Sequence, residues 1–121
     1  MALILVVDDS MFARLQITAK LKEGGFDVIE GKNGQEGLEK LQDSQVDCIL
    51  SDLLMPVMDG FEFLERLKQD GNSIPVLVMS SDIQQSSRDK VMALGAAELI
   101  NKPPNYTELI EKINTLINKK D

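Results

Sequence analysis

The sequence contains no histidine, no tryptophan and only one cysteine. Without histidine, the chain cannot supply a Ser-His-Asp triad or an imidazole ligand for a metal. A single cysteine excludes an internal disulfide and is typical of a protein from a reducing cytoplasm. Cys48 lies in an apolar run, and no imidazole is available to activate its thiol. We therefore expect a buried, unreactive cysteine.

Positive charge is also scarce. The chain has 13 Lys and Arg against 20 Asp and Glu, for a net charge of −7. Nucleic acids and anionic membranes bind basic surfaces, so this balance argues against both as partners. The apolar run near the start ends at Val7 with no positive residue before it, which is unlike a signal peptide, and no stretch approaches membrane-spanning length. The acidic balance suits a site that binds a cation.

What is present is enough for one folded domain. The chain has 121 residues, of which 43% are hydrophobic, a size and composition typical of a single domain with its own core. We find no linker, repeat or low-complexity segment. We therefore expect residues 1–121 to form one domain without an appended output domain.

Short apolar segments alternate along the chain with longer segments that have helical spacing. Strands are predicted at residues 3–7, 26–30, 47–51, 75–80 and 97–100, with helices after Ser10, after Asn33, at 61–68, at 84–94 and from Asn105. Strict alternation of this kind predicts an α/β fold, with a parallel sheet covered by helices on both faces.

Polar residues stand where the predicted strands end: Asp8, Asp9, Asp52, Ser80, Ser81 and Lys102. In open α/β sheets, ligands bind outside the carboxyl ends of the strands. Residues that are far apart in the sequence are therefore expected to meet in one crevice.

Three carboxylates in one crevice repel one another. Two unit charges about 4 Å apart interact by roughly 4 kcal/mol at an effective dielectric constant of 20. Protonation or a hard divalent cation relieves this repulsion, and oxygen ligands favour Mg²⁺. A phosphoryl oxygen could complete the metal's coordination, and Lys102 and Ser80 could bind the remaining oxygens. We interpret the cluster as a phosphoryl-transfer site with an aspartate nucleophile.

The same residues resemble a known family. "VVDDS" (6–10), "SDLLMPVMDG" (51–60), "VMSS" (78–81) and "GAAELINKP" (95–103) occur in the order and spacing of response-regulator receiver domains of two-component signalling, the CheY-like proteins. The resemblance covers nearly the whole chain. It implies a doubly wound, flavodoxin-like fold with five parallel strands in the order 2-1-3-4-5.

The resemblance also implies a role for each matching residue. Asp52 would accept a phosphoryl group from a phosphohistidine on a sensor histidine kinase or a histidine phosphotransfer protein. The implied ligands of Mg²⁺ are Asp8, Asp9, Asp52 and the backbone carbonyl of Leu54. Ser80 and Lys102 would contact the phosphoryl group, and Lys102–Pro103 would be a cis peptide. The modified protein, which is not itself an enzyme, would signal to a downstream effector through a phosphorylation-dependent surface.

Two positions depart from the family pattern. Leu99 stands where the family often has an aromatic residue, so we expect the outward signal to depend on shifts in the loop and helix before it. Leu54 and Asp82 occupy positions that tune dephosphorylation in the family. Because an apolar Leu54 cannot orient an attacking water, we hypothesise a long-lived phosphoryl group.

Other interpretations remain open. Asp8, Asp9 and Ser10 could merely cap a helix. The chain could instead be a Mg²⁺-dependent phosphatase or phosphotransferase with an aspartyl intermediate, although it lacks the second acid of a DxD pair at Asp52 and room for a cap domain. It could also be an unphosphorylated, receiver-like scaffold. Met11 and Leu15 are either ordinary exposed apolar residues or a docking patch for the phosphodonor.

Overall fold

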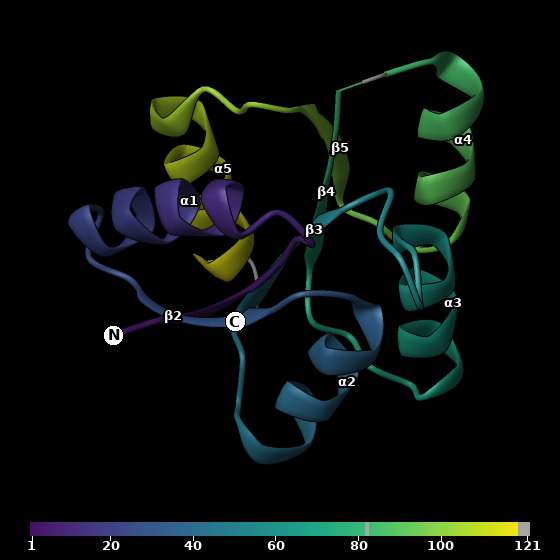
Figure 1. Cartoon of the computed structure of the whole chain (residues 1–121), viewed down its shortest axis with the longest axis horizontal. Helices are drawn as coiled ribbons and strands as arrows, with labels where there is room; N and C mark the ends of the chain where they lie inside the picture. The colour runs from purple at the N-terminus through teal and green to yellow at the C-terminus, as the bar shows by residue number, and fades with distance from the viewer. Residues whose placement is uncertain (82, 119–121) are drawn as a thin grey trace.

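The computed structural model describes residues 1–81 and 83–118, which form five strands and five helices in alternation (Figure 1). The elements are β1 (Leu3–Val7), α1 (Met11–Glu23), β2 (Asp27–Gly31), α2 (Gly34–Asp43), β3 (Cys48–Asp52), α3 (Gly60–Gln69), β4 (Val76–Ser80), α4 (Gln85–Ala93), β5 (Glu98–Asn101) and α5 (Tyr106–Asn118). Asp82, named above for its effect on dephosphorylation, lies outside the described residues. In the part of the chain that is described, no helix is both long and apolar enough to cross a membrane.

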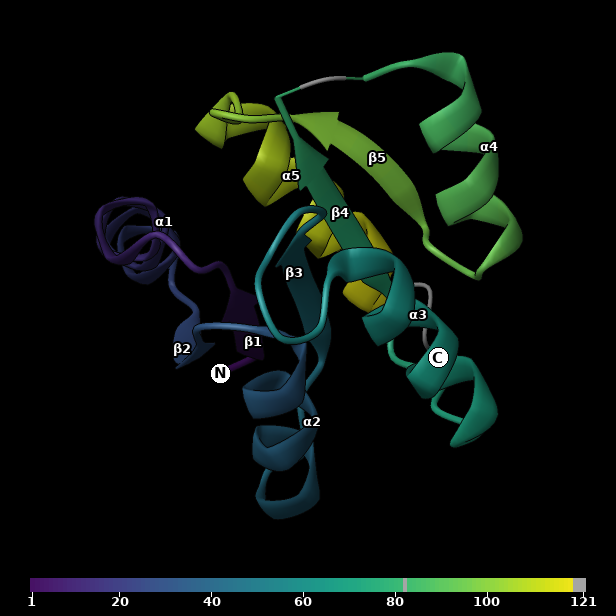
Figure 2. The ribbon, with the colours of Figure 1, turned by 45° about the vertical axis from the view of Figure 1, so that its right-hand side comes forward.

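The strands form one parallel sheet in the order β2-β1-β3-β4-β5. Figure 2 shows β3, β4 and β5 side by side with their arrows running toward the same edge. This arrangement confirms the doubly wound, flavodoxin-like fold expected from the sequence. It places the carboxyl ends of β1 and β3 next to each other at the centre of the sheet, because Val7 lies opposite Ser51 in the β1–β3 ladder.

The core lies in two layers, one on each face of the sheet. Alternate residues of β1 point to opposite faces, as the two-residue period of a strand requires. Leu5 and Val7 pack with residues of α2, α3 and α4, whereas Ile4 and Val6 pack with residues of α1 and α5. Figure 1 shows the same division, with α1 and α5 on one side of the sheet. The central strands are therefore covered on both faces and hold the site rigidly.

Local signals set most helix starts. The side chains of Ser10, Asn33, Asp59 and Asn105 each accept a hydrogen bond from the backbone N–H three residues later, which satisfies an otherwise unpaired donor of the first turn. Gly37 lies inside α2 because a Cβ there would come within 3.1 Å of both Phe63 and Val7. The low helix propensity of this glycine is therefore offset by close packing of α2.

The second strand begins one residue later than predicted. The apolar character of Phe26 suggested that it begins the strand, and its side chain is indeed buried. Its N–H, however, donates to Leu21 O at 3.1 Å, next to Gly25 at φ +92°, so its backbone completes the C-terminal turn of α1. The third and fifth strands are shifted in the same direction by one residue, and the fourth begins at Val76, one residue later than predicted.

Candidate functional site

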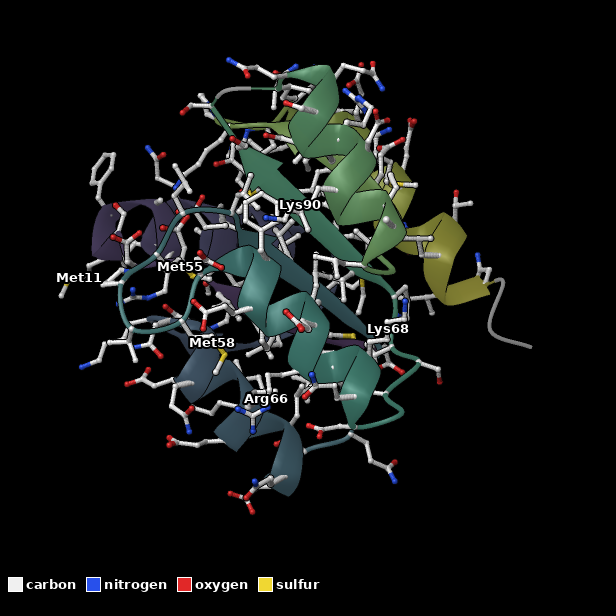
Figure 3. The ribbon with its side chains drawn as sticks, turned by 90° about the vertical axis from the view of Figure 1, so that its right-hand side faces the viewer. Met11, Met55, Met58, Arg66, Lys68 and Lys90 are labelled. Carbon is white, nitrogen blue, oxygen red and sulfur yellow. The ribbon has the colours of Figure 1, made fainter. Side chains whose placement is uncertain are left out.

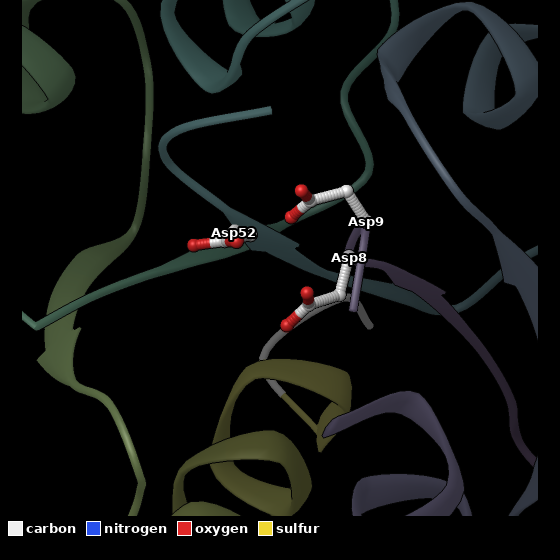
Figure 4. A group of neighbouring side chains, drawn as sticks. All are labelled: Asp8, Asp9 and Asp52. Carbon is white, nitrogen blue, oxygen red and sulfur yellow. The ribbon is translucent and has the colours of Figure 1, made fainter. Parts of the chain in front are cut away.

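Three aspartates meet at the carboxyl end of the sheet. Asp8 follows β1, Asp52 ends the neighbouring strand β3, and Asp9 lies in the loop before α1 (Figure 4). One carboxylate oxygen from each lies within 4.8 Å of the others. Asp8 is fully buried and Asp52 is 7% exposed, whereas Asp9 is open to solvent. The sheet register thus gathers acids that are up to 44 positions apart in the sequence into one cluster.

The backbone holds the two buried carboxylates in place. Ser10 N donates to Asp8 Oδ1 at 2.9 Å, and Leu53 N donates to Asp52 Oδ1 at 2.9 Å. In each residue one oxygen is fixed by the loop that follows the strand. The second oxygen of each, Oδ2, is directed to a shared cation.

That cation is the ammonium of Lys102. Its Nζ lies 2.8 Å from Asp8 Oδ2 and 3.0 Å from Asp52 Oδ2. Lys102 follows β5, and its backbone N–H donates to Ser80 O at 3.0 Å, which ties it to the end of β4. The peptide between Lys102 and Pro103 is cis, as the family resemblance implies. Lys102 therefore bridges the two buried acids from the loop that follows β5.

Burial and the charge balance shift the pKa values of these groups. Burial raises the pKa of Asp52, and the negative charge of Asp8 adds to this effect. The hydrogen bond from Lys102 opposes both without cancelling them. For Lys102, burial alone would lower the pKa, but the contacts with Asp8 and Asp52, together with the negative charges of these two acids, outweigh burial and the pKa is raised. The cluster holds more negative charge than one ammonium neutralises, and this excess favours binding of a further cation.

The loop after β3 is held close to the strand. A Cβ at Gly60 would lie 2.8 Å from both Asp52 O and Leu53 Cα, so only glycine fits there. Gly60 N donates to Leu53 O at 2.7 Å. Between these anchors, the Leu54 side chain is 68% exposed and Val57 adopts φ +69°, which is rare for a β-branched residue. The metal-ligand role of the Leu54 carbonyl stays a prediction.

Strands β4 and β5 carry two more positions named from the sequence. One is the predicted site residue Ser80, and the other is Leu99, which departs from the family pattern. Ser80 ends β4 and is 5% exposed, one residue beyond the Met79 position that pairs with Asp52. Ser81, which follows it, is exposed. Leu99 on β5 is 2% exposed and packs in the apolar layer beside Val91 of α4. The position where the family often has an aromatic residue is thus filled by a fixed aliphatic side chain.

The donor set fits a magnesium ion. All three acids offer hard oxygen ligands at close range, and neither sulfur nor imidazole is present among them. A magnesium ion would share its ligands with the ammonium of Lys102, which contacts the same two buried carboxylates. The residues at this edge of the sheet can therefore bind a divalent cation and position an anionic group beside it.

Sequence reasoning missed two residues of the site's surroundings. Arg14 of α1 donates from Nη1 to the backbone carbonyl of Asp8, and from Nε to Glu30 Oε1 of β2 at 3.2 Å. Arg14 follows the Ser10 cap by four residues and lies outside the apolar stripe of its helix. That position, together with an acid near the end of the adjacent strand, is the signal that could have identified it.

Comparison with known proteins agrees with this geometry. Residues 4–114 match the response regulator receiver domain family. The chain is 39% identical over 116 residues to the response regulator RR06 of Streptococcus pneumoniae, covering 96% of this chain and 53% of that protein. It is 34% identical over 116 residues to the chemotaxis protein CheY of Bacillus subtilis, covering 95% of this chain and 97% of that protein. It thus spans about half the length of some curated relatives and nearly all of others.

A solved structure shows the same fold throughout. The receiver domain of the Francisella response regulator 1452 superposes with a TM-score of 0.95 at 26% identity, covering 100% of both chains. Receiver domains generally bind Mg²⁺ at an acidic pocket, and the three aspartates form an acidic cluster at the corresponding edge of the sheet here. From the family match, the fold and the relatives together, this chain belongs to the response regulator receiver domain family of two-component systems.

Proposed function

We propose that the chain is a receiver that is phosphorylated on Asp52 and signals through a protein-binding surface. The observation that carries this proposal is the position of Asp52, which ends the central strand β3 between two further aspartates and one lysine. A sensor histidine kinase or a histidine phosphotransfer protein supplies the phosphoryl group, since this chain has no histidine. We also propose a cytoplasmic location for this receiver, as expected from the sequence.

In the proposed reaction, an Asp52 carboxylate oxygen attacks the phosphorus of the donor's phosphohistidine. The O–P bond forms as the P–N bond breaks, and the leaving imidazole keeps the electron pair of the broken bond. A bound Mg²⁺ would neutralise charge on the phosphoryl oxygens. Asp8, Asp9 and Asp52 would hold the ion, with the Leu54 carbonyl completing the protein ligands. Lys102 would move its contact from Asp52 Oδ2 to a phosphoryl oxygen, and Ser80 would donate to another.

We propose that the phosphodonor docks beside this acidic site. The side chains of Met11 and Leu15, at the start of α1, are 66% and 60% exposed. Figure 3 shows Met11 pointing away from the ribbon. Apolar side chains this exposed, next to an acidic site, suit contact with the apolar face of a donor's helices. Alanine at both positions should slow phosphotransfer from a protein donor and leave phosphorylation by a small donor unchanged; equal protein-donor rates would contradict the docking role.

The outgoing signal must take a different form from an aromatic flip. Leu99 is buried and aliphatic, so it offers no ring to exchange between an outward and an inward position. We propose that phosphorylation shifts α4 and its neighbours instead, through the backbone contact from Lys102 N to Ser80 O.

An exposed, apolar Leu54 cannot orient a hydrolytic water, which supports a long-lived phosphoryl group. Rapid decay that does not slow in Asp82→Ala would contradict this.

Acetyl phosphate with MgCl₂, followed by intact mass spectrometry, tests the proposal. A receiver gains one phosphoryl group, Asp52→Asn gains none, and no added phosphomonoester is turned over. Sustained turnover of such a substrate would favour the alternative of a Mg²⁺-dependent phosphatase or phosphotransferase. If the wild-type protein gains no mass, the scaffold alternative is favoured and the proposal fails.

A further inference from the structure

Arg14 connects the acidic site to the edge of the sheet. Its side chain is 14% exposed, although it is a charged residue on a surface helix. It makes the two contacts described above, one to the backbone carbonyl of Asp8 and one to the carboxylate of Glu30. Glu30 lies opposite Val6 in the β1–β2 ladder, and Val6 stands two residues before Asp8 in the sequence. Arg14 of α1 thus contacts both the loop that follows β1 and strand β2.

The carbonyl that Arg14 binds has a special position. It belongs to the peptide bond that joins Asp8 to Asp9, the two adjacent acids of the cluster. The N–H of Asp8 is also fixed, because it donates to Gly31 O at 3.1 Å. The N–H of Asp8 is thus anchored to β2, and its carbonyl is anchored to Arg14, which Glu30 holds in turn. The plane of the Asp8–Asp9 peptide therefore cannot rotate freely. The orientation of that peptide plane sets the direction in which the side chains of Asp8 and Asp9 leave the backbone.

We propose that Arg14 and Glu30 are a positioning pair for the divalent cation: Arg14, oriented by Glu30, fixes the Asp8–Asp9 peptide so that both carboxylates face one ion. This inference rests on the magnesium role in the proposed function. Some residues hold the metal ligands in place without contacting the metal. Replacing such a residue typically lowers metal affinity about 10–100-fold. Arg14 touches no predicted ligand oxygen of the ion and acts only through the backbone of Asp8.

If Arg14 acted through its charge alone, its loss would change Mg²⁺ affinity in the opposite direction. A guanidinium close to a cation site repels the ion, so a purely electrostatic Arg14 would weaken binding, and its loss would strengthen it. Glu30 neutralises Arg14 at 3.2 Å, which leaves orientation as the main effect. Arg14→Lys keeps the positive charge but lacks the planar fork that reaches two acceptors at once. It therefore removes the orientation and retains the charge.

The experiment compares Mg²⁺ affinity by isothermal titration calorimetry in the wild type, Arg14→Lys, Glu30→Gln and the double variant. Arg66→Lys is the matched control, since Arg66 is exposed on α3 (Figure 3), which packs on the face of the sheet opposite α1. We expect Arg14→Lys to weaken Mg²⁺ binding by about 10-fold. Glu30→Gln should weaken it by less, the double variant by no more than Arg14→Lys alone, and the control should not change it.

Urea unfolding in EDTA separates positioning from simple stabilisation. A positioning pair changes Mg²⁺ affinity by a much larger factor than it changes the metal-free unfolding equilibrium. An Arg14→Lys affinity within about twofold of wild type overturns the inference, as does an equal loss in Arg66→Lys. If Arg14→Lys does not fold, Glu30→Gln decides by the same twofold criterion. A wild-type protein that binds no Mg²⁺ overturns the proposed function itself, which is a distinct outcome.

Discussion

Replacing Lys102 with methionine removes the cation between the two buried carboxylates while keeping the apolar stem of the side chain. Lys102 Nζ lies 2.8 Å from Asp8 and 3.0 Å from Asp52. Without it, two largely buried acids face each other with no neutralising partner. We expect the variant to be less stable than the wild type in EDTA at neutral pH.

The magnitude follows from burial. Removing one partner of a buried ion pair typically costs about 3–5 kcal/mol, because the remaining charge stays buried. The Lys102 side chain retains 23% exposure, so water partly screens its contacts and the cost is smaller. We therefore expect a loss of about 2 kcal/mol in the free energy of unfolding.

Magnesium should reverse much of this loss. In the wild type, the ion competes with the ammonium for Asp8 and Asp52, and in Lys102→Met the competitor is absent. A ligand that binds only the folded state adds RT ln(1 + [L]/Kd) to stability, so tenfold tighter binding adds about 1.4 kcal/mol at saturation. Saturating MgCl₂ should therefore stabilise Lys102→Met more than the wild type.

The assay is urea unfolding followed by far-ultraviolet circular dichroism, since the chain has no tryptophan for fluorescence. Lys40→Met, at an exposed position of α2, controls for the loss of a surface charge. Two results would refute the reasoning. One is a Lys102→Met stability within about 0.5 kcal/mol of the wild type in EDTA, the usual effect of a surface change. The other is an equal gain from MgCl₂ in both proteins.

Three further predictions concern the same edge of the sheet. Burial raises the folded-state pKa of Asp52 above its unfolded value, so ionisation of Asp52 opposes folding. In urea titrations, the stability of Asp52→Asn relative to wild type should therefore rise from acid to neutral pH. A stability difference that does not change with pH would contradict the pKa shift. Val57→Asn should raise stability by about 1 kcal/mol, because asparagine tolerates the positive φ of this exposed position better than valine; an unchanged urea midpoint would argue against backbone strain. Gly60→Ala should lower stability by at least about 2 kcal/mol in the same assay, because its Cβ would meet backbone atoms of Asp52 and Leu53; tolerance of alanine would mean that the loop yields easily.

Periodicity and local capping predicted the elements well. The apolar runs identified all five strands, and the cap residues Ser10, Asn33 and Asn105 marked helix starts, because both signals are local. The strand order came from the family resemblance, since neither periodicity nor caps encode which strands become neighbours. Phe26 was misassigned because its side chain suits a strand while its backbone completes a helix.

The convergence of the acids was predictable, but their detailed contacts were not. Strand ends in a parallel sheet meet at one edge, so Asp8, Asp52 and Lys102 could be placed together before the structure was known. The Arg14–Glu30 contact depends on how α1 is rotated over β2, which no local pattern specifies. For the same reason the sequence could not tell that Lys102 bridges both buried acids.

The most direct test of the account is to locate the phosphoryl group by peptide mapping after treatment with acetyl phosphate, with MgCl₂ and with EDTA. The account predicts that the modification lies on the peptide containing Asp52, fragments to that residue, and disappears in EDTA. A phosphoryl group on Asp8 or Asp9, or equal incorporation without a divalent cation, would contradict it.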